Sequence, residues 1–230
     1  MRLQTKTAFA ALIAGVAMVG SADAAPITWG SATDTAGPSD VVGGGAVVEA
    51  IDGIAAAASA TNPTVDGVSF TSATTLGNTA PASTNVLAPN TSGDASYDNL
   101  LKQATFGGGT STVYTVNGLT NGVDYYIQVW FTETRTANNL DERVMTYSDN
   151  EGVPNTVDLA GGIGGVASAT LGQYVIGTFT ASGTSQDLGL ITNSFGNAHF
   201  NALLVREVPE PGSIALLGLG GLMMARRRRK

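Results

Sequence analysis

The side chains that could do chemistry are few in this 230-residue chain. It contains no Cys and a single His, His199, which excludes a thiol nucleophile, a thiolate metal site and a multi-histidine zinc site. A serine triad would need His199 as its base, but no Gly-x-Ser-x-Gly turn is present, so we interpret His199 as a strand-end side chain at a loop. The segment 162–167 fits a dinucleotide glycine pattern without the βαβ unit that such a site needs. We therefore expect no catalytic residue and no enzyme activity.

Carboxylates are the remaining candidates for chemistry. Two acids at a suitable separation can hydrolyse a glycosidic bond, and several carboxylates with backbone carbonyls can hold a structural Ca²⁺. The acids that lie near one another in the sequence are Glu133, Asp141, Glu142, Asp149 and Glu151. Their spacing does not distinguish them from a solvated acidic loop, and residues 149–152 do not fit the EF-hand pattern. We predict no cofactor and no metal site, with a structural calcium as the alternative.

One strand carries the residue types that bind sugars. Aromatic rings that stack on a sugar face, next to polar groups that hold its hydroxyls, form such sites. The candidate glycan-binding residues are Tyr126, Trp130, Glu133 and Arg135. Two alternatives remain open: Trp130 packs as an ordinary core residue, and Arg135, like Arg143, pairs with a nearby acid.

The elements that would position these side chains are mostly short strands. In segment 123–134, an apolar face of Tyr125, Ile127, Val129 and Phe131 alternates with a second face, which predicts a central strand with the first face buried. Further strands are predicted at 26–31, 46–51, 64–71, 111–116, 144–147, 156–159, 174–180, 186–192 and 199–206, separated by Gly and Asn turns. Segment 96–104 has the one convincing helical pattern of the domain. The pattern predicts an all-β sandwich with one short helix.

The N-terminus has the pattern of a secretory signal peptide. Arg2 and Lys6 precede an apolar run over 8–20, and Ala22-Asp23-Ala24 forms a small-x-small site. We expect a signal helix over residues 1–24, cleaved between Ala24 and Ala25 by signal peptidase after the secretion machinery has engaged it.

The C-terminus has three ordered parts. Val208-Pro209-Glu210-Pro211 ends the preceding fold, because the two prolines favour extended backbone. An uncharged segment over 213–225 then leads to a basic cluster made of Arg226, Arg227, Arg228, Arg229 and Lys230. Thirteen residues are short for a helix that must cross a bilayer, which needs about 20. A short hydrophobic helix with a cytoplasmic basic stop suits a transient anchor better than a permanent one.

This order of motif, apolar run and Arg cluster resembles the PEP-CTERM sorting tail of Gram-negative bacteria. The resemblance covers 208–230, about a tenth of the chain. It implies that exosortase, a membrane-embedded cysteine protease, recognises and removes the tail during export. The implied route crosses the inner membrane, anchors the protein there transiently and ends at the cell surface or outside the cell.

The region 25–207 resembles the jelly-roll domains of the galactose-binding-like and malectin-like groups. The resemblance is diffuse and rests on five segments: 48–53, 66–70, 125–131, 177–181 and 200–206. It implies a jelly-roll β-sandwich and, less directly, sugar binding.

Removal of both ends changes the charge of the protein. Residues 25–209 carry 4 basic and 16 acidic side chains, a net charge of −12. Such a surface repels nucleic acid and anionic lipid. The sequence thus predicts a structural or adhesive protein of the extracellular polysaccharide matrix or envelope. A carbohydrate-binding module that contacts exopolysaccharide is the alternative, and a glycan-active enzyme is a third and weaker one.

Overall fold

The computed structural model describes residues 25–53, 62–73, 75–80, 92–133, 143–161, 172–193 and 196–210. The expected signal helix, the hydrophobic tail helix and the basic cluster lie outside these residues. Within the described part of the chain, no helix has the length and apolar character to span a membrane.

The larger sheet has the strand order β1-β13-β10-β16-β3-β6, with β2 also pairing with β13. All its pairs are antiparallel except β3 with β6. Its strands are β1 (Thr28–Trp29), β2 (Thr33–Asp34), β3 (Val47–Asp52), β6 (Thr71–Ser72), β10 (Asp124–Phe131), β13 (Gln173–Thr180) and β16 (Ala202–Glu207). The long strand predicted over 123–134 is therefore the central strand β10.

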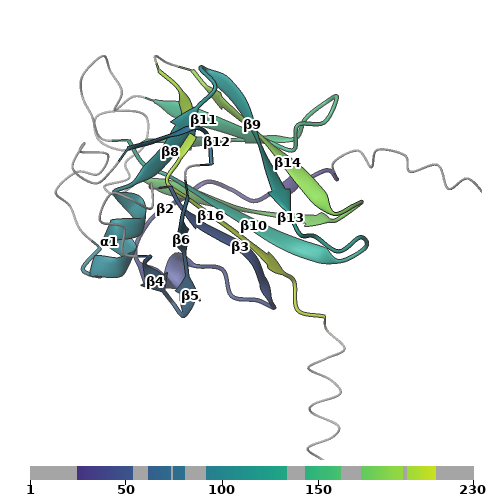
Figure 1. Ribbon diagram of the computed structural model, residues 1–230, viewed down its shortest axis with the longest axis horizontal. Helices are drawn as coiled ribbons and strands as arrows, with labels where there is room; N and C mark the ends of the chain where they lie inside the picture. The colour runs from purple at the N-terminus through teal and green to yellow at the C-terminus, as the bar shows by residue number, and fades with distance from the viewer. Residues whose placement is uncertain are drawn as a thin grey trace, which may run out of the picture.

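A four-stranded sheet faces the larger one (Figure 1). Its order is β12-β11-β14-β9, with bounds β12 (Thr156–Ala160), β11 (Val144–Ser148), β14 (Ser185–Thr192) and β9 (Ser111–Asn117). A three-stranded sheet contains β15 (Ala198–Phe200), β8 (Ala104–Gly107) and β7 (Asn78–Ala80), and β4 (Thr64–Val65) pairs with β5 (Val68–Ser69). Segment 64–71 thus contains a hairpin with a tight turn at Asp66-Gly67, one of the two conformations that this dipeptide predicts beside a bulge, and both residues have positive φ.

The two main sheets have jelly-roll connectivity. In chain order, their eight main strands are β3, β9, β10, β11, β12, β13, β14 and β16. In the larger sheet, the first (β3), eighth (β16), third (β10) and sixth (β13) of these strands lie side by side. In the smaller sheet, the second (β9), seventh (β14), fourth (β11) and fifth (β12) lie side by side. This alternation between two antiparallel sheets is the jelly roll. The predicted all-β jelly-roll sandwich with one short helix is confirmed.

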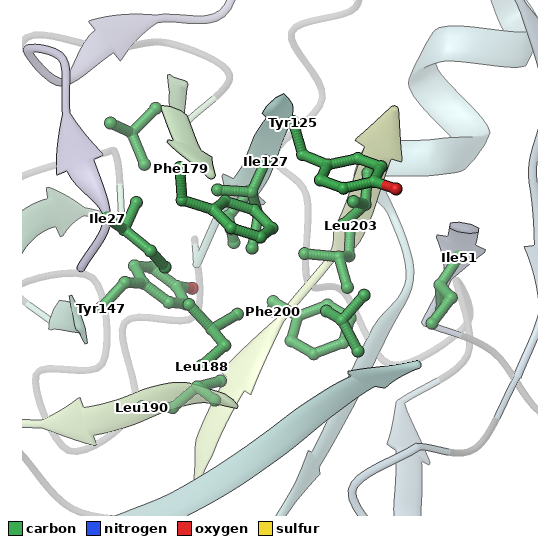
Figure 2. Packing of buried hydrophobic residues seen from close by; sticks show 14 of the residues in the cluster. Ile27, Ile51, Tyr125, Ile127, Tyr147, Phe179, Leu188, Leu190, Phe200 and Leu203 are labelled. Carbon is green, nitrogen blue, oxygen red and sulfur yellow. The ribbon is translucent and has the colours of Figure 1, made fainter. Parts of the chain in front are cut away.

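The core fills the space between these sheets. The inward face of β10 is the apolar face that alternation predicted, with Ile127, Val129 and Phe131 fully buried. Figure 2 shows side chains of both sheets meeting there, with Tyr147, Leu188 and Leu190 from the smaller sheet and Ile127, Phe179 and Leu203 from the larger one. Burial of this apolar area is the main stabilising term of the domain.

The outer face of the larger sheet is covered by a second apolar layer. Helix α1 (Ala95–Leu101) and the β4–β5 hairpin lie on this side, away from the smaller sheet (Figure 1). The buried residues of this layer are Val41, Ala50, Val65, Val68, Phe70, Tyr97, Leu100, Leu101, Trp130, Ala202 and Leu204. The short 3-10 helix η1 (Pro38–Asp40) is also tied to α1, through a hydrogen bond from Tyr97 to Asp40.

The helix boundaries have local causes. Asp94 is the N-cap, and its Oδ1 accepts from Tyr97 N at 2.8 Å. Asn201 Nδ2 donates to the carbonyls of Leu101 and Gln103 at 2.8 Å each. The helix predicted over 96–104 therefore ends at Leu101, and Ala104 already belongs to β8.

Candidate functional site

A shallow hollow opens on the outer face of the larger sheet near the start of β10. Its volume is about 380 Å³, and its lining residues are Pro26, Thr28, Asp124, Tyr126, Thr178, Phe179, Thr180 and Val208. Strand pairing assembles it, because Tyr126 and Thr28 both lie opposite Thr178. The pair Asp124–Thr180 forms the next row.

The chemistry of the hollow suits a ligand rich in hydroxyl groups. Tyr126 is half-buried and contributes an aromatic ring, while Asp124 is exposed. The Asp124 Oδ1 accepts a 2.5 Å hydrogen bond from Thr180 Oγ1, which fixes the carboxylate at the rim. An aromatic surface beside a carboxylate and threonine hydroxyls is a pattern of carbohydrate sites.

The other predicted glycan-binding residues do not join Tyr126 at this hollow. Trp130 is 0% exposed, and its ring packs edge-on against Phe70 with centroids 5.9 Å apart. Its Nε1 donates to Tyr97 Oη at 3.2 Å. Trp130 is thus an ordinary core residue, which was the alternative to sugar binding, and its ring is not accessible to a sugar. Arg135 lies outside the described residues.

Glu133 belongs to a buried polar cluster instead. Its Oε2 lies 3.4 Å from Arg143 Nη1, so Arg143 has the acidic partner that was the alternative to ligand binding. The same Nη1 lies 3.1 Å from His199 Nδ1, and the His199 ring packs on Phe131 with centroids 4.8 Å apart. Tyr147 Oη donates to the His199 carbonyl at 2.8 Å. These contacts tie together β10, β11 and β15, which is a structural role.

The acidic loop also has a structural organisation. Asp149 is fully buried, and its carboxylate accepts from the backbone N–H groups of Ile27, Glu151 and Asn155 at 3.2 Å each. This ordering of the loop and of the N-terminal segment accounts for Asp149 without a metal or a substrate. Asp141 and Glu142 lie outside the described residues, and among those described no group of three His, Asp or Glu is placed to hold a metal.

Both predicted processing sites adjoin the hollow. Ala25, the first residue of the expected mature chain, is 6% exposed, and its N donates to Gln186 Oε1 at 2.9 Å. The next residue, Pro26, lines the hollow. At the other end, β16 stops at Glu207, and Val208 N donates to the Asp124 carbonyl at 2.9 Å. The Pro-Glu-Pro motif thus leaves the fold directly after its last strand.

Comparison with protein families settles the nature of this C-terminus. Residues 207–230 match the PEP-CTERM protein-sorting motif. The chain carries a PEP-CTERM tail. The tail indicates an exosortase-sorted protein that is exported to the cell surface, in agreement with the order of features in the sequence.

Solved structures give more distant likenesses. The extracellular domain of ANXUR1 from Arabidopsis thaliana is 13% identical with a TM-score of 0.47, over 71% of this chain and 49% of that one. BtGH115A, a family GH115 4-O-methyl-α-glucuronidase with specificity for decorated arabinogalactans, is 12% identical with a TM-score of 0.32, over 46% of this chain and 14% of that one. The PEP-CTERM chain therefore spans about half of the first protein and a small part of the second. No curated protein sequence matches it.

Sequence reasoning missed most of the residues around Tyr126. Thr28, Asp124, Thr178 and Thr180 come from three strands, and only the pairing register brings them together. The sequence did hold one signal: Asp124 and Tyr126 alternate with the buried face of β10, which places both on its other side.

Proposed function

We propose that this PEP-CTERM protein is a non-enzymatic structural or adhesive component of the extracellular polysaccharide matrix or envelope. The observation that carries the proposal is the direct junction between the sorting tail and a jelly roll, because Val208 still pairs with Asp124 while Pro209 and Glu210 are exposed. Tail removal would leave the jelly roll as the working part of the protein at the surface.

The side chains that could support catalysis have structural partners, which favours a non-enzymatic role. Glu133 is held by Arg143, and Asp149 is held by backbone N–H groups.

The processing route follows from the two ends. Signal peptidase would cleave between Ala24 and Ala25, and the apolar segment 213–225 would hold the precursor in the inner membrane with Arg226–Lys230 on the cytoplasmic side. Exosortase would then release the jelly roll.

The outer face of the smaller sheet supports contact with a hydrated matrix. Thr146 Oγ1 donates to Asp158 Oδ1, and Thr115 Oγ1 donates to Asp187 Oδ1, both at 2.6 Å between paired strands. These hydroxyl–carboxylate pairs present ordered polar groups on exposed strands. A matrix role is tested by fractionating cultures: the mature protein should co-sediment with exopolysaccharide, and its recovery as freely soluble protein in the medium would contradict the role.

Carbohydrate binding is the second candidate function, favoured by the hollow around Tyr126. The test is a glycan array with the mature protein, followed by affinity electrophoresis in each polysaccharide that scores. Tyr126→Ala should weaken binding by about two- to tenfold, since stacking on an aromatic ring contributes on the order of 0.5–1.5 kcal/mol. Val153→Ala, at an exposed position far along the chain, is the matched control. Absence of binding to every neutral and acidic glycan would reject this candidate and leave the structural role.

A further inference from the structure

Three side chains on β3, on β6 and directly after α1 have buried oxygen atoms without hydrogen-bond partners. Asp52 is fully buried, and neither of its carboxylate oxygens is hydrogen-bonded. Ser72 Oγ and Gln103 Oε1 are buried and unpartnered as well. Buried polar atoms are nearly always hydrogen-bonded, so the unpartnered oxygens on these three residues require a physical explanation.

Strand register brings Asp52 and Ser72 together. Asp52 ends β3, and Ser72 is its partner in the parallel strand β6. Asp52 is also opposite Ala202, which belongs to the apolar layer under α1, so its side chain lies on the outer face of the sheet. Register partners on neighbouring strands point to the same face, so the two side chains share the outer face of the sheet, without a hydrogen bond between them.

The segment after α1, which begins with Gln103, passes the end of β3. A Cβ added to Gly53, the residue after Asp52, would lie 2.4 Å from Thr105 N. The chain at 104–105, directly after Gln103, therefore packs against the residue that follows β3. The Gln103 side chain is anchored at the end of α1, where its Nε2 donates to the Asn99 carbonyl at 3.0 Å and its Oε1 has no partner.

No described cation neutralises the Asp52 carboxylate. Burial alone raises the pKa of Asp52 to about 7, with no contribution from a neighbouring charge. Of the charged groups on the elements packed around it, Asp98 of α1 accepts from Ser92, and Arg206 of β16 donates to the carbonyls of residues 42, 44 and 45. Lys102, at the C-cap of α1, makes no ion pair with it.

We propose that Asp52, Ser72 and Gln103 form a calcium site that closes the outer layer of the sandwich. A carboxylate, a hydroxyl and an amide oxygen are hard ligands of the kind that Ca²⁺ selects, and water and backbone carbonyls complete its shell. The cation replaces the hydrogen bonds and the counter-charge that the buried carboxylate lacks. The site is separate from the acids at 133–151 and from the hollow at Tyr126.

A single carboxylate sets the affinity of such a site. Calcium sites of extracellular modules bind with Kd on the order of 10⁻⁴–10⁻³ M, which suits an exported protein with one charged ligand. Binding to the folded state alone should then raise the melting temperature by roughly 3–6 °C at about ten times Kd. The gain should shrink as the pH falls below 7, because the proton competes for the same carboxylate.

The first experiment measures the melting temperature of the mature protein at pH 8, with EDTA and then with about 10 mM free Ca²⁺, with ionic strength held constant by NaCl. Wild type should gain stability in Ca²⁺. Asp52→Asn keeps the side-chain volume and should show no gain, while melting above wild type in EDTA because the uncompensated charge is gone. Asp187→Asn, on the exposed face of the other sheet, should keep the full gain.

Terbium luminescence provides a second measurement that does not depend on stability. Trp130, Ala202 and Asp52 lie in one row across three neighbouring strands, so Trp130 is roughly 10 Å from the site. Tb³⁺ bound at Asp52 should be sensitised by Trp130, displaced by Ca²⁺, and lost in Asp52→Asn. Trp29→Phe removes the other tryptophan and should leave the signal. Absence of a Ca²⁺ gain in wild type, or a gain and a terbium signal that persist in Asp52→Asn, would overturn the proposal.

Discussion

Tyr97 donates a 2.6 Å hydrogen bond from its hydroxyl to Asp40 Oδ2 beneath helix α1. The Asp40 carboxylate also accepts from the backbone N–H groups of Ala36 and Gly37, and Tyr97 Oη accepts from Trp130 Nε1. One buried hydroxyl thus joins α1, η1 and the central strand β10. The burial of the phenol and, after it, the hydrogen bond to the Asp40 carboxylate and its negative charge raise the pKa of Tyr97 far above its usual range.

Tyr97→Phe should destabilise the domain by about 1–3 kcal/mol, because it leaves Trp130 Nε1 without an acceptor and removes one donor from Asp40. Urea unfolding followed by tryptophan fluorescence measures the change. Tyr126→Phe, at the half-buried tyrosine of the hollow, is the matched control and should change the unfolding free energy by less than about 0.5 kcal/mol. Equal effects of the two changes would contradict the linking role of Tyr97.

Asp52 should make the calcium-free domain less stable as the pH rises. The pKa of its carboxyl is about 7 in the fold, against 3.8 as the reference value. The folded state therefore holds this proton more tightly than the unfolded chain, so its stabilising contribution is complete below pH 4 and is lost as the pH rises through 7. The difference amounts to a few kcal/mol at most.

Asp52→Asn isolates this contribution. In EDTA, the unfolding free energies of wild type and variant should diverge between pH 4 and pH 8, with the variant the more stable at pH 8. Denaturant titrations at several pH values measure the difference. Parallel pH profiles for the two proteins would show that the Asp52 carboxyl does not titrate with the fold.

The alternation of apolar and polar residues predicted the sandwich, because within each strand it indicates which face is buried. The residues of β10 show this: Ile127, Val129 and Phe131 face the core as their spacing predicts. The second face of β10 could not be assigned in this way. Its alternation is compatible with Trp130 packed under a covering layer and with Trp130 exposed to solvent. The layer above it comes from α1 and the β4–β5 hairpin, which are distant in sequence, so no local pattern could report the burial of Trp130.

The residues of the candidate site differ in whether they are contiguous in the sequence, and this decides which of them the sequence could predict. The Pro209-Glu210-Pro211 motif is read from a contiguous stretch, so the sequence alone predicted it. The hollow needs Thr28, Tyr126 and Thr178 in one row, which depends on the register of β1, β10 and β13. Asp52 and Ser72 lie opposite each other through a parallel pairing of β3 with β6 that neither segment predicts.

Gly177→Ala should destabilise the attachment of the N-terminal segment. A Cβ at this position would lie 2.5 Å from Ile27 Cγ2 and 2.8 Å from Trp29 Cε3, so β1 must move away from β13. Overpacking of this kind costs about 1–3 kcal/mol. Gly152→Ala is the control, because a Cβ there meets no atom within 4 Å. Urea unfolding compares the two, and limited proteolysis should release the N-terminal segment faster in Gly177→Ala.

Replacement of Pro209, Glu210 and Pro211 by Ala should block processing without unfolding the domain. The last backbone bond of the fold, from Val208 N to the Asp124 carbonyl, precedes all three positions. Mass spectrometry of the protein from its own cells should therefore find the Arg-rich end retained in the variant and absent from wild type. The unfolding midpoint of the triple-alanine variant should match that of wild type.

Val153→Ala is the control for this variant, since it changes an exposed residue outside the motif and should be processed normally. Pro209 and Glu210 are exposed where the chain leaves β16, so a protease can reach them while the jelly roll stays folded. Retention of the Arg-rich end in wild type would refute removal of the tail, and its loss from the triple-alanine variant would show that the protease reads the apolar segment and the basic cluster without the prolines and the glutamate.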